Sequence, residues 1–289
     1  MTNIFTLLRT FDAVAAHNGF TAAANALNIG QPTITTQIKA LEELYGVELI
    51  LRRGRRVELS EIGEALQKIT QRIFVLKDEA HELLENSGQL RTGHLRISAV
   101  GSYYVTSVTR LFRQRYPDYD VSVELGNTTA AQAKLLDLTS DVAIVAHEIS
   151  DPRIHTVPLG VHEVVLFVNR DHPWFGRDSI KLRERARESV VVREPGSETR
   201  RALEAAIESA NIDVNKVMEI GSRECVWHLV KQGMGIGVVT EIEYIPEPNL
   251  CKIRIEDSPV KLEFRLGYLA ERSRSLKIVE VIRIANELL

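Results

Sequence analysis

The sequence predicts an α/β protein that begins with an all-α helix-turn-helix domain. Two observations carry this prediction. Residues 18–45 combine two short helical segments around a tight turn, and the chain beyond residue 93 alternates strand and helix patterns. Between these regions, residues 61–87 have the spacing of one long helix. The chain of 289 residues is 44% hydrophobic and 26% charged, which is ordinary for a globular protein.

Residues 22–27 and 32–45 are the two expected helices of the N-terminal motif. The Thr21 hydroxyl can cap the first helix, and Asn28-Ile29-Gly30 breaks it, because Asn and Gly both tolerate positive φ. Pro32 lies in the first turn of the second helix, where its missing N–H is not needed. The segment therefore has the order of a helix-turn-helix.

The second helix has one apolar face and one face of small polar groups. Ile34, Ile38, Leu41 and Tyr45 recur at helical spacing, which predicts the side that packs against the domain. The outer face carries short donors and acceptors of the kind that meet base edges in the major groove. The candidate DNA contacts are Gln31, Pro32, Thr33, Thr35, Thr36 and Lys39. The alternative is an ordinary amphipathic helix pair.

A predicted hairpin with clustered arginines follows. Within residues 47–59, two β-prone runs flank Gly54. Residues 1–60 carry six Lys/Arg and five Asp/Glu, so their net charge is only +1, but four of the cations lie on this turn. Local charge density is what phosphate contact needs. These candidate contacts are Arg52, Arg53, Arg55 and Arg56. The alternative is a solvated turn.

Residues 61–87 predict a helix that pairs two subunits. Ser60 can cap it, and Glu61 and Glu64 suit the positive end of its dipole. Apolar residues then follow a spacing of four and three over about three heptads, as in a coiled coil. They are Ile62, Leu66, Ile69, Ile73, Leu76, Ala80 and Leu83. Packing of this stripe on its own domain is disfavoured by the polar flanks. Residues 88–93, bounded by two glycines, read as a hinge.

The C-terminal part alternates strands and helices. Strands are expected at His94–Ala99, Asp120–Leu125, Asp141–Ala146, Glu163–Asn169, Ser189–Arg193, Lys216–Ile220 and Gly235–Val239. Helices are expected at Ser102–Arg115, Thr129–Leu138, Ser197–Ala210 and Glu224–Lys231. This order implies parallel sheets covered by helices.

Small polar and charged residues follow several of these strands, mostly where helices begin. Helix N-termini have unpaired N–H groups and a positive dipole end, so several at one cleft favour an anion. The candidate ligand residues are Ser102, Thr128, Thr129, His147, Ser197, Thr199, Arg200, Ser222 and Arg223. Each Ser or Thr alone is an ordinary helix cap. We expect a carboxylate, phosphate, sulfate or phosphonate, with Pro195–Arg200 as one clamp.

FTAAANALNIGQPTITTQIKALEELYGVELI and RRVELSEIGEAL resemble the N-terminal domain of LysR-type transcriptional regulators. The similarity in length and domain order extends over essentially the whole chain. Three positions depart from the family pattern: Gly30, Thr36 and Ile50 stand where Ser, Arg and Phe are common. The missing basic residue at position 36 leaves the base preference open.

The resemblance implies a winged helix-turn-helix DNA-binding domain at 1–60, a dimerisation helix at 61–87 and a hinge at 88–93. It then implies two Rossmann-like, periplasmic-binding-protein-like subdomains, one at 94–160 with a return at 268–289 and one at 161–267. A small effector would bind between them, at positions that match the candidate residues above. The expected partners are double-stranded DNA, the effector, the chain itself as a homodimer and tetramer, and RNA polymerase as a further partner that the family admits.

Two other classes of protein remain as alternatives. A solute-binding protein without DNA function would carry a signal peptide, whereas the N-terminus reads as an amphipathic helix with Arg9 and Asp12. No apolar run approaches the roughly 18 residues of a membrane span, so we expect a cytoplasmic protein. The net charge of −3 argues against general nucleic-acid binding, so any attraction to DNA must be local.

An enzyme is the second alternative, and the near-motifs do not support it. Gly233–Gly237 runs from helix into strand, which is the reverse of a dinucleotide loop, and His81–Glu85 lacks the second histidine of a zinc protease. Cys225 and Cys251 lack CxxC spacing, so we expect no metal site and no cofactor. A redox role for Cys225 is kept as a minor alternative.

Overall fold

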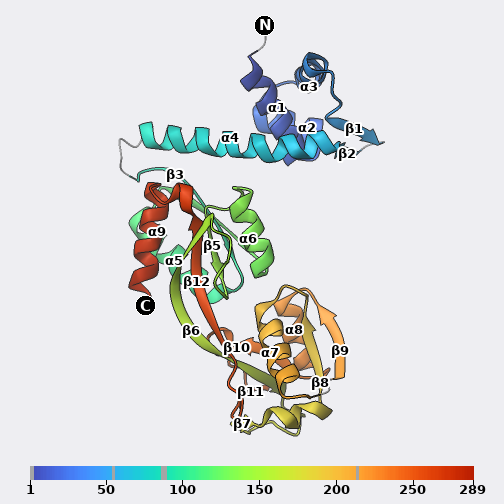
Figure 1. Ribbon diagram of the computed structural model, residues 1–289, viewed down its shortest axis with the longest axis vertical. Helices are drawn as coiled ribbons and strands as arrows, with labels where there is room; N and C mark the ends of the chain where they lie inside the picture. The colour runs from blue at the N-terminus through green and yellow to red at the C-terminus, as the bar shows by residue number, and fades with distance from the viewer. Residues whose placement is uncertain (1–2, 54–55, 86–89, 213–214) are drawn as a thin grey trace. The chain divides into compact units, whose positions relative to one another are not determined.

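The computed structural model describes residues 3–53, 56–85, 90–212 and 215–289 (Figure 1). The chain divides into two compact units. Unit 1 is Met1–Gly88 with Asp137–Thr139, and unit 2 is Gln89–Leu136 with Ser140–Leu289. No helix within the described ranges is both long enough and apolar enough to cross a membrane.

Unit 1 is a three-helix core with a small hairpin and a long helix. Its elements are α1 (Ile4–Ala16), α2 (Phe20–Leu27), α3 (Gln31–Tyr45), β1 (Ile50–Arg53), β2 (Arg56–Leu59) and α4 (Glu61–Glu85). Ile34, Ile38 and Leu41 of α3 are buried with Phe11 of α1, which confirms the predicted inner face. Tyr45 is 61% exposed, so its assignment to that face was wrong. It is the last residue of α3, and the buried residues of this helix end at Leu41.

The helix-turn-helix differs from the prediction in two details, one at the start of α2 and one in the turn between α2 and α3. Gly19 is the N-cap of α2, and Thr21 lies inside the first turn. Its hydroxyl therefore does not cap the helix but donates to Gln31 Oε1 at 3.2 Å. Asn28 takes the left-handed conformation, with φ of 52°, whereas Gly30 has φ of −69° and does not use its freedom.

The hairpin is held to α3 by one carboxylate. β1 and β2 pair antiparallel, with Ile50 opposite Leu59. Glu42 Oε1 accepts from the backbone N–H of Leu49 at 2.8 Å and of Ile50 at 3.1 Å. The helix that carries the candidate base contacts and the hairpin that carries the candidate phosphate contacts are thus tied together.

Helix α4 begins as the sequence predicts. Ser60 Oγ accepts from the backbone N–H of Gly63 at 3.0 Å, which is the expected cap. Further along, Thr70 Oγ1 donates to Asp12 Oδ1 of α1 at 2.8 Å. A burial cost raises the pKa of Asp12, and the Thr70 hydrogen bond offsets part of that rise. One side of α4 is therefore packed on the helix-turn-helix core.

Unit 2 is a mixed α/β structure. Its strands are β3 (Gly93–Ala99), β4 (Tyr119–Leu125), β5 (Val142–Val145), β6 (Ile154–Asn169), β7 (Ser179–Ile180), β8 (Ser189–Arg193), β9 (Asn215–Ile220), β10 (Gly237–Thr240), β11 (Leu250–Ile255) and β12 (Lys261–Leu269). Its helices are α5 (Ser102–Arg115), α6 (Thr128–Leu136), α7 (Glu198–Ser209), α8 (Arg223–Lys231) and α9 (Leu276–Glu287), with 3-10 turns η1 (Leu182–Arg187), η2 (Glu241–Glu243) and η3 (Ala270–Arg272).

The main sheet is mixed rather than parallel. Its strand order is β4-β3-β5-β12-β6-β11-β7, and β10 pairs with β6. β3 runs parallel to β4 and β5, but β12 runs antiparallel to both β5 and β6. The expectation of parallel sheets therefore holds for β3, β4 and β5 and for the pair of β8 and β9, but it was wrong for β6, which pairs antiparallel with β10, β11 and β12. β11 and β12 were not recognised as strands.

Strand β6 is also much longer than predicted. It spans 16 residues, and only its second part, Glu163–Asn169, was expected. Pro158 and Gly160 interrupt the hydrophobic pattern of the first part. The structure accommodates them with an irregularity in the register between Phe264 and Arg265 of β12, which face Gly160 and Pro158 respectively. β6 and β12 extend from one part of unit 2 to the other (Figure 1).

Two halves of unit 2 can be defined by their cores. The first half packs β3, β5, α5 and α9 around residues such as Leu95, Phe112 and Val281. The second half packs β8, β10, α7 and α8 around residues such as Val191 and Leu203. Because α9 belongs to the first half, the chain returns there after building the second half (Figure 1).

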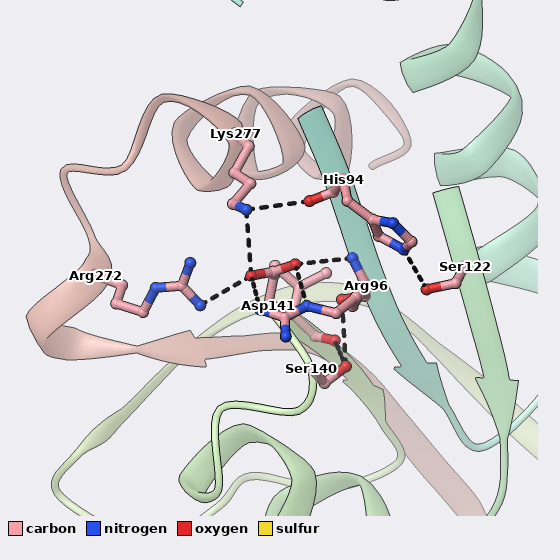
Figure 2. A network of polar contacts seen from close by, with 8 residues as sticks. His94, Arg96, Ser122, Ser140, Asp141, Arg272 and Lys277 are labelled. Atoms are coloured by element: carbon pink, nitrogen blue, oxygen red, sulfur yellow. Dashed lines mark hydrogen bonds and ion pairs between the residues drawn. The ribbon is translucent and has the colours of Figure 1, made fainter. Parts of the chain in front are cut away.

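A buried charge cluster fixes the first half at the start of β5. Asp141 is fully buried, and its carboxylate binds Arg96 at 3.0 Å, Arg272 at 2.9 Å and Lys277 at 3.5 Å (Figure 2). Burial by itself would raise the pKa of Asp141, but Lys277, Arg96 and Arg272 together hold it well below its usual range. The cluster joins β3, β5, η3 and α9.

Candidate functional sites

The outer face of α3 is open to solvent. Gln31, Pro32, Thr33, Thr36 and Lys39 are exposed and Thr35 is half-buried. The hydroxyls of Thr35 and Thr36 donate to backbone carbonyls one turn earlier, of Gln31 at 3.2 Å and of Pro32 at 3.0 Å. Their lone pairs and methyl groups remain to face outward. The surface can therefore accept hydrogen bonds and make apolar contacts, both of which base edges offer in the major groove.

The arginines of the β1–β2 hairpin are only partly described by the structure. Arg52, Arg53 and Arg56 lie on β1 and β2, but their side chains are outside the described residues, and Arg55 lies outside them entirely. The hairpin that carries them is present at the expected place. Their contact with phosphate stays a prediction.

Helix α4 has an apolar row on the side turned away from its own domain. Ile62, Ile69 and Leu76 are each more than half exposed. Of the other predicted positions, Ala80 is exposed, Leu66 and Ile73 are half-buried, and the Leu83 side chain lies outside the described residues. The spacing of the exposed residues is seven, so they form one line along the helix.

Four helices of unit 2 begin at one cleft. The N-terminal residues of α5 and α8 line a space of about 290 Å³, together with Val100, Leu125, Gly126 and Arg193. The starts of α6 and α7 line an adjoining space of about 10 Å³, which shares Val100, Gly126, Arg193 and Arg223 with the first. The helices contribute from both halves, since α5 and α6 belong to the first and α7 and α8 to the second.

Six of the nine candidate ligand residues are brought together there. Ser102, Ser222 and Arg223 line the larger space, and Thr128, Ser197 and Thr199 line the smaller one. Ser222 also caps α8 by accepting from the Cys225 N–H at 3.3 Å. Thr128 Oγ1 is buried and has no hydrogen-bond partner among the residues that the structure describes.

The other three are not brought into the lining. Thr129 is exposed. Arg200 lies along its own helix and binds Glu204 at 3.0 Å and Glu219 at 2.7 Å, so its fork is directed to β9. His147 contacts Glu198 across the two halves, with Nδ1 3.2 Å from Oε1.

Five polar residues of the cleft were not among the nine candidates. Asn127, Arg193, Glu198 and Glu243 line the smaller space and Glu224 lines the larger one, and of these five only Glu198 lies within the predicted clamp Pro195–Arg200. Asn127 could have been found, because Asn is a strong N-cap residue and its Oδ1 accepts from Ala130 N–H at 2.9 Å. Glu243 had no such signal, because it follows a strand, β10, whose end only the fold directs to the cleft.

Each cleft arginine is already paired with a carboxylate. Arg193 makes a two-point contact with Glu194, at 2.7 and 2.9 Å. Burial would raise the pKa of Glu194, but the Arg193 hydrogen bond overcomes it and the pKa is lowered. Arg223 binds Glu243, and its Nη2 donates to the Val100 carbonyl at 3.0 Å.

Comparison with known proteins assigns both units. Residues 5–64 match the family described as "Bacterial regulatory helix-turn-helix protein, lysR family", and residues 88–289 match the "LysR substrate binding domain". The transcriptional activator CmpR of Synechocystis sp. is 30% identical over 93% of this chain and 90% of its own length. The regulator CbbR of Xanthobacter flavus is 28% identical over 94% of this chain and 83% of its own.

Solved structures agree on the fold. Full-length CbnR in complex with its target DNA has a TM-score of 0.74 at 22% identity, covering 99% of each chain. A full-length OxyR variant from Pseudomonas aeruginosa also has 0.74, at 20% identity, covering 100% of this chain and 94% of that one. The chain belongs to the LysR family: it is a DNA-binding transcriptional regulator with an effector-binding domain.

Proposed function

We propose that this regulator binds paired operator half-sites as a homodimer or a dimer of dimers and responds to a small anion in the cleft of unit 2. In this scheme residues 1–60 contact DNA, 61–87 pair subunits and 88–93 form the hinge. Residues 94–160 with 268–289, and residues 161–267, are the two halves around the effector. The protein acts in the cytoplasm, where its operator lies, and binds the effector without turning it over.

The observation that carries the ligand class is the convergence of four helix N-termini with two arginines. Each N-terminus contributes a positive dipole end, and Arg193 and Arg223 add two guanidinium groups, each of which is paired with a carboxylate of the chain. The hydroxyls of Ser102, Ser197 and Thr199 provide neutral donors of the kind that oxyanions accept. A carboxylate, phosphate, sulfate or phosphonate fits this set.

Relatives support both the DNA binding and the ligand binding in this proposal. CbnR has been solved with its target DNA. The regulatory domain of CcmR from Synechocystis has been solved in complex with 2-PG, and it matches 68% of this chain and 97% of its own at a TM-score of 0.62 and 24% identity. For the present chain, α3 and the β1–β2 hairpin supply the DNA surface.

The mechanism is a shift between conformations of the sensing domain. An effector changes a regulator only if it binds one conformation more tightly than the other. A ligand held by helices from both halves satisfies this condition, because its contacts depend on the distance between the halves. The change in shape alters how subunits pack, and hence the spacing of the DNA-binding domains.

Footprinting on the DNA upstream of the protein's own gene tests the proposal. The purified protein is compared with and without inorganic phosphate, sulfate and a panel of small carboxylates and phosphonates. We expect protection of paired half-sites whose pattern one anion changes. No protection at low salt, where attraction to phosphate is strongest, would refute the DNA-binding assignment. Protection that no anion alters would refute the ligand class. Recovery of the active anion unchanged checks that it is not a substrate.

A further inference from the structure

Glu243 places a carboxylate from the second half against the first half, inside the cleft. It belongs to η2, and its side chain is only 2% exposed. One oxygen, Oε1, binds Arg223 and lies so close to Gly101 that a β-carbon at position 101 would collide with it. Gly101 is the N-cap residue of α5. The carboxylate thus lies at the start of a helix with an arginine beside it.

The second oxygen of Glu243 is held as well. Oε2 accepts from the Thr240 hydroxyl at 2.7 Å, and both groups are buried. Arg223 in turn donates to the carbonyl of Val100, so the same guanidinium touches both halves. An arginine and a hydroxyl that a small oxyanion could use here, and the space at the start of α5, are already taken by a carboxylate of the chain itself.

We infer that Glu243 is an internal competitor of the effector and a determinant of effector affinity. It occupies Arg223 and the start of α5, so an incoming anion must displace its carboxylate to gain both contacts. The inference rests on the proposed anion site and adds that binding there is an exchange of one anion for another. Replacing the carboxylate by an uncharged group of the same shape should therefore tighten anion binding.

The chain offers a matched control for charge. Glu224 lines the same cleft and begins the same helix region as Arg223, but its side chain is 84% exposed and no contact with Arg223 is seen among the described residues. Glu224→Gln removes one negative charge near the cleft without releasing the arginine. A difference in sulfate affinity between Glu243→Gln and Glu224→Gln then reports the contact of Glu243 with Arg223 and not the long-range effect of a negative charge.

The experiment titrates the full-length protein with inorganic sulfate, by calorimetry and by thermal unfolding. We expect Glu243→Gln to lower the sulfate Kd by about 10-fold or more, because a hydrogen bond to a charged group is worth about that much. Glu224→Gln should stay within about 2-fold of the unsubstituted protein. The general stabilisation of proteins by sulfate is common to all variants and cancels in the comparison.

Thr240→Val keeps the inference testable if Glu243→Gln fails to fold. It preserves the shape of a fully buried side chain and removes only the hydroxyl that holds Oε2. The sulfate Kd of Thr240→Val should lie between the Kd of the unsubstituted protein and the Kd of Glu243→Gln. A sulfate Kd below that of the unsubstituted protein, in Glu243→Gln or in Thr240→Val, supports the inference.

The outcomes separate this inference from the proposed anion site. Saturable sulfate binding with the same Kd in the unsubstituted protein, Glu243→Gln and Thr240→Val overturns the inference and leaves the anion site standing. Sulfate binding that survives Arg223→Ala at full strength overturns the assignment of the site. Absence of saturable binding in every variant, Glu243→Gln included, overturns both.

Discussion

Arg272 donates a hydrogen bond to Asp141 at 2.9 Å, with both side chains almost completely buried. The two residues lie on η3 and at the start of β5, and Lys277 of α9 joins them. The final segment of the chain is therefore bound by charge to the centre of the first half (Figure 2). Removing one member of such a cluster leaves buried charges without compensation.

Asp141→Asn should destabilise the protein by about 3–5 kcal/mol, because Arg272 and Lys277 lose their buried counter-charge. Urea unfolding measures the loss. Asp78→Asn is the control, since it breaks a pair with Lys77 in which both side chains are more than half exposed, and it should barely move the midpoint. Equal effects of the two substitutions would contradict the structural role of the cluster.

The same cluster sets a pH dependence. The pKa of Asp141 is lowered in the folded state, so its carboxylate contributes stability above the ordinary pKa of 3.8. That contribution diminishes as the pH falls below this value. The difference in unfolding free energy between the unsubstituted protein and Asp141→Asn should shrink from pH 7 to pH 3. A constant difference would show that packing and not charge explains the loss.

Gly46 ends α3 in the left-handed conformation, with φ of 65°, and a β-carbon there would touch nothing within 4 Å. Gly46→Ala should therefore cost about 1 kcal/mol for conformational reasons alone. Gly30→Ala is its match, because Gly30 has φ of −69° and room for a β-carbon. Thermal unfolding of both variants tests the pair, and a loss at position 30 as large as that at 46 would refute the argument.

Lys39 is the one cation on the outer face of α3 and is exposed. Lys39→Glu should abolish operator binding while leaving the oligomer intact. Lys39→Ala should reduce the dependence of affinity on salt by about one unit of slope if its ammonium meets one phosphate. Fluorescence anisotropy over a range of salt concentrations measures both. Unchanged affinity in Lys39→Glu would place the DNA surface elsewhere.

Ile69 lies in the middle of the exposed row of α4. Ile69→Asp should shift the protein from dimer to monomer, because a charge in a coiled-coil seam is not compensated. Lys68→Asp, one position away on the exposed side, is the control and should leave the mass in sedimentation unchanged. A dimer that survives Ile69→Asp at low micromolar concentration would exclude this row as the interface.

Ser102 and Thr199 lie on opposite sides of the cleft, at the start of α5 and within the first turn of α7. Ser102→Ala combined with Thr199→Ala should weaken the response to the effector more than the affinity for DNA. Footprints with and without the active anion give both quantities. If the double variant responds fully, the effector binds elsewhere.

Local patterns explain why much of the fold could be predicted. The inner face of α3, the Ser60 cap and the alternation of β3, α5 and β4 follow from periodicity over neighbouring residues. β12 and the first part of β6 could not be recognised in the same way. Their pairing joins residues far apart in sequence, such as Leu262 with His162, and a proline and a glycine interrupt the pattern.

The candidate site shows the same division. The starts of helices could be located, and six of nine proposed residues meet at the cleft. What could not be predicted is how charges pair. Arg200 binds Glu219 of β9, and Arg223 binds Glu243, and both pairings depend on which strands become neighbours. The sign of a side chain's charge can be predicted from the sequence, but the residue with which it pairs is set by the fold.

The late position of β12 and α9 in the chain has a consequence for damage to the gene. β12 lies between β5 and β6 in the sheet, and α9 covers the first half. A premature stop codon shortly before residue 261 would spare the buried core of the second half yet remove the middle of the first. Loss of residues 261–289 would thus destabilise the first half, where the sensing domain begins, because the buried Asp141 would lose its partners Arg272 and Lys277.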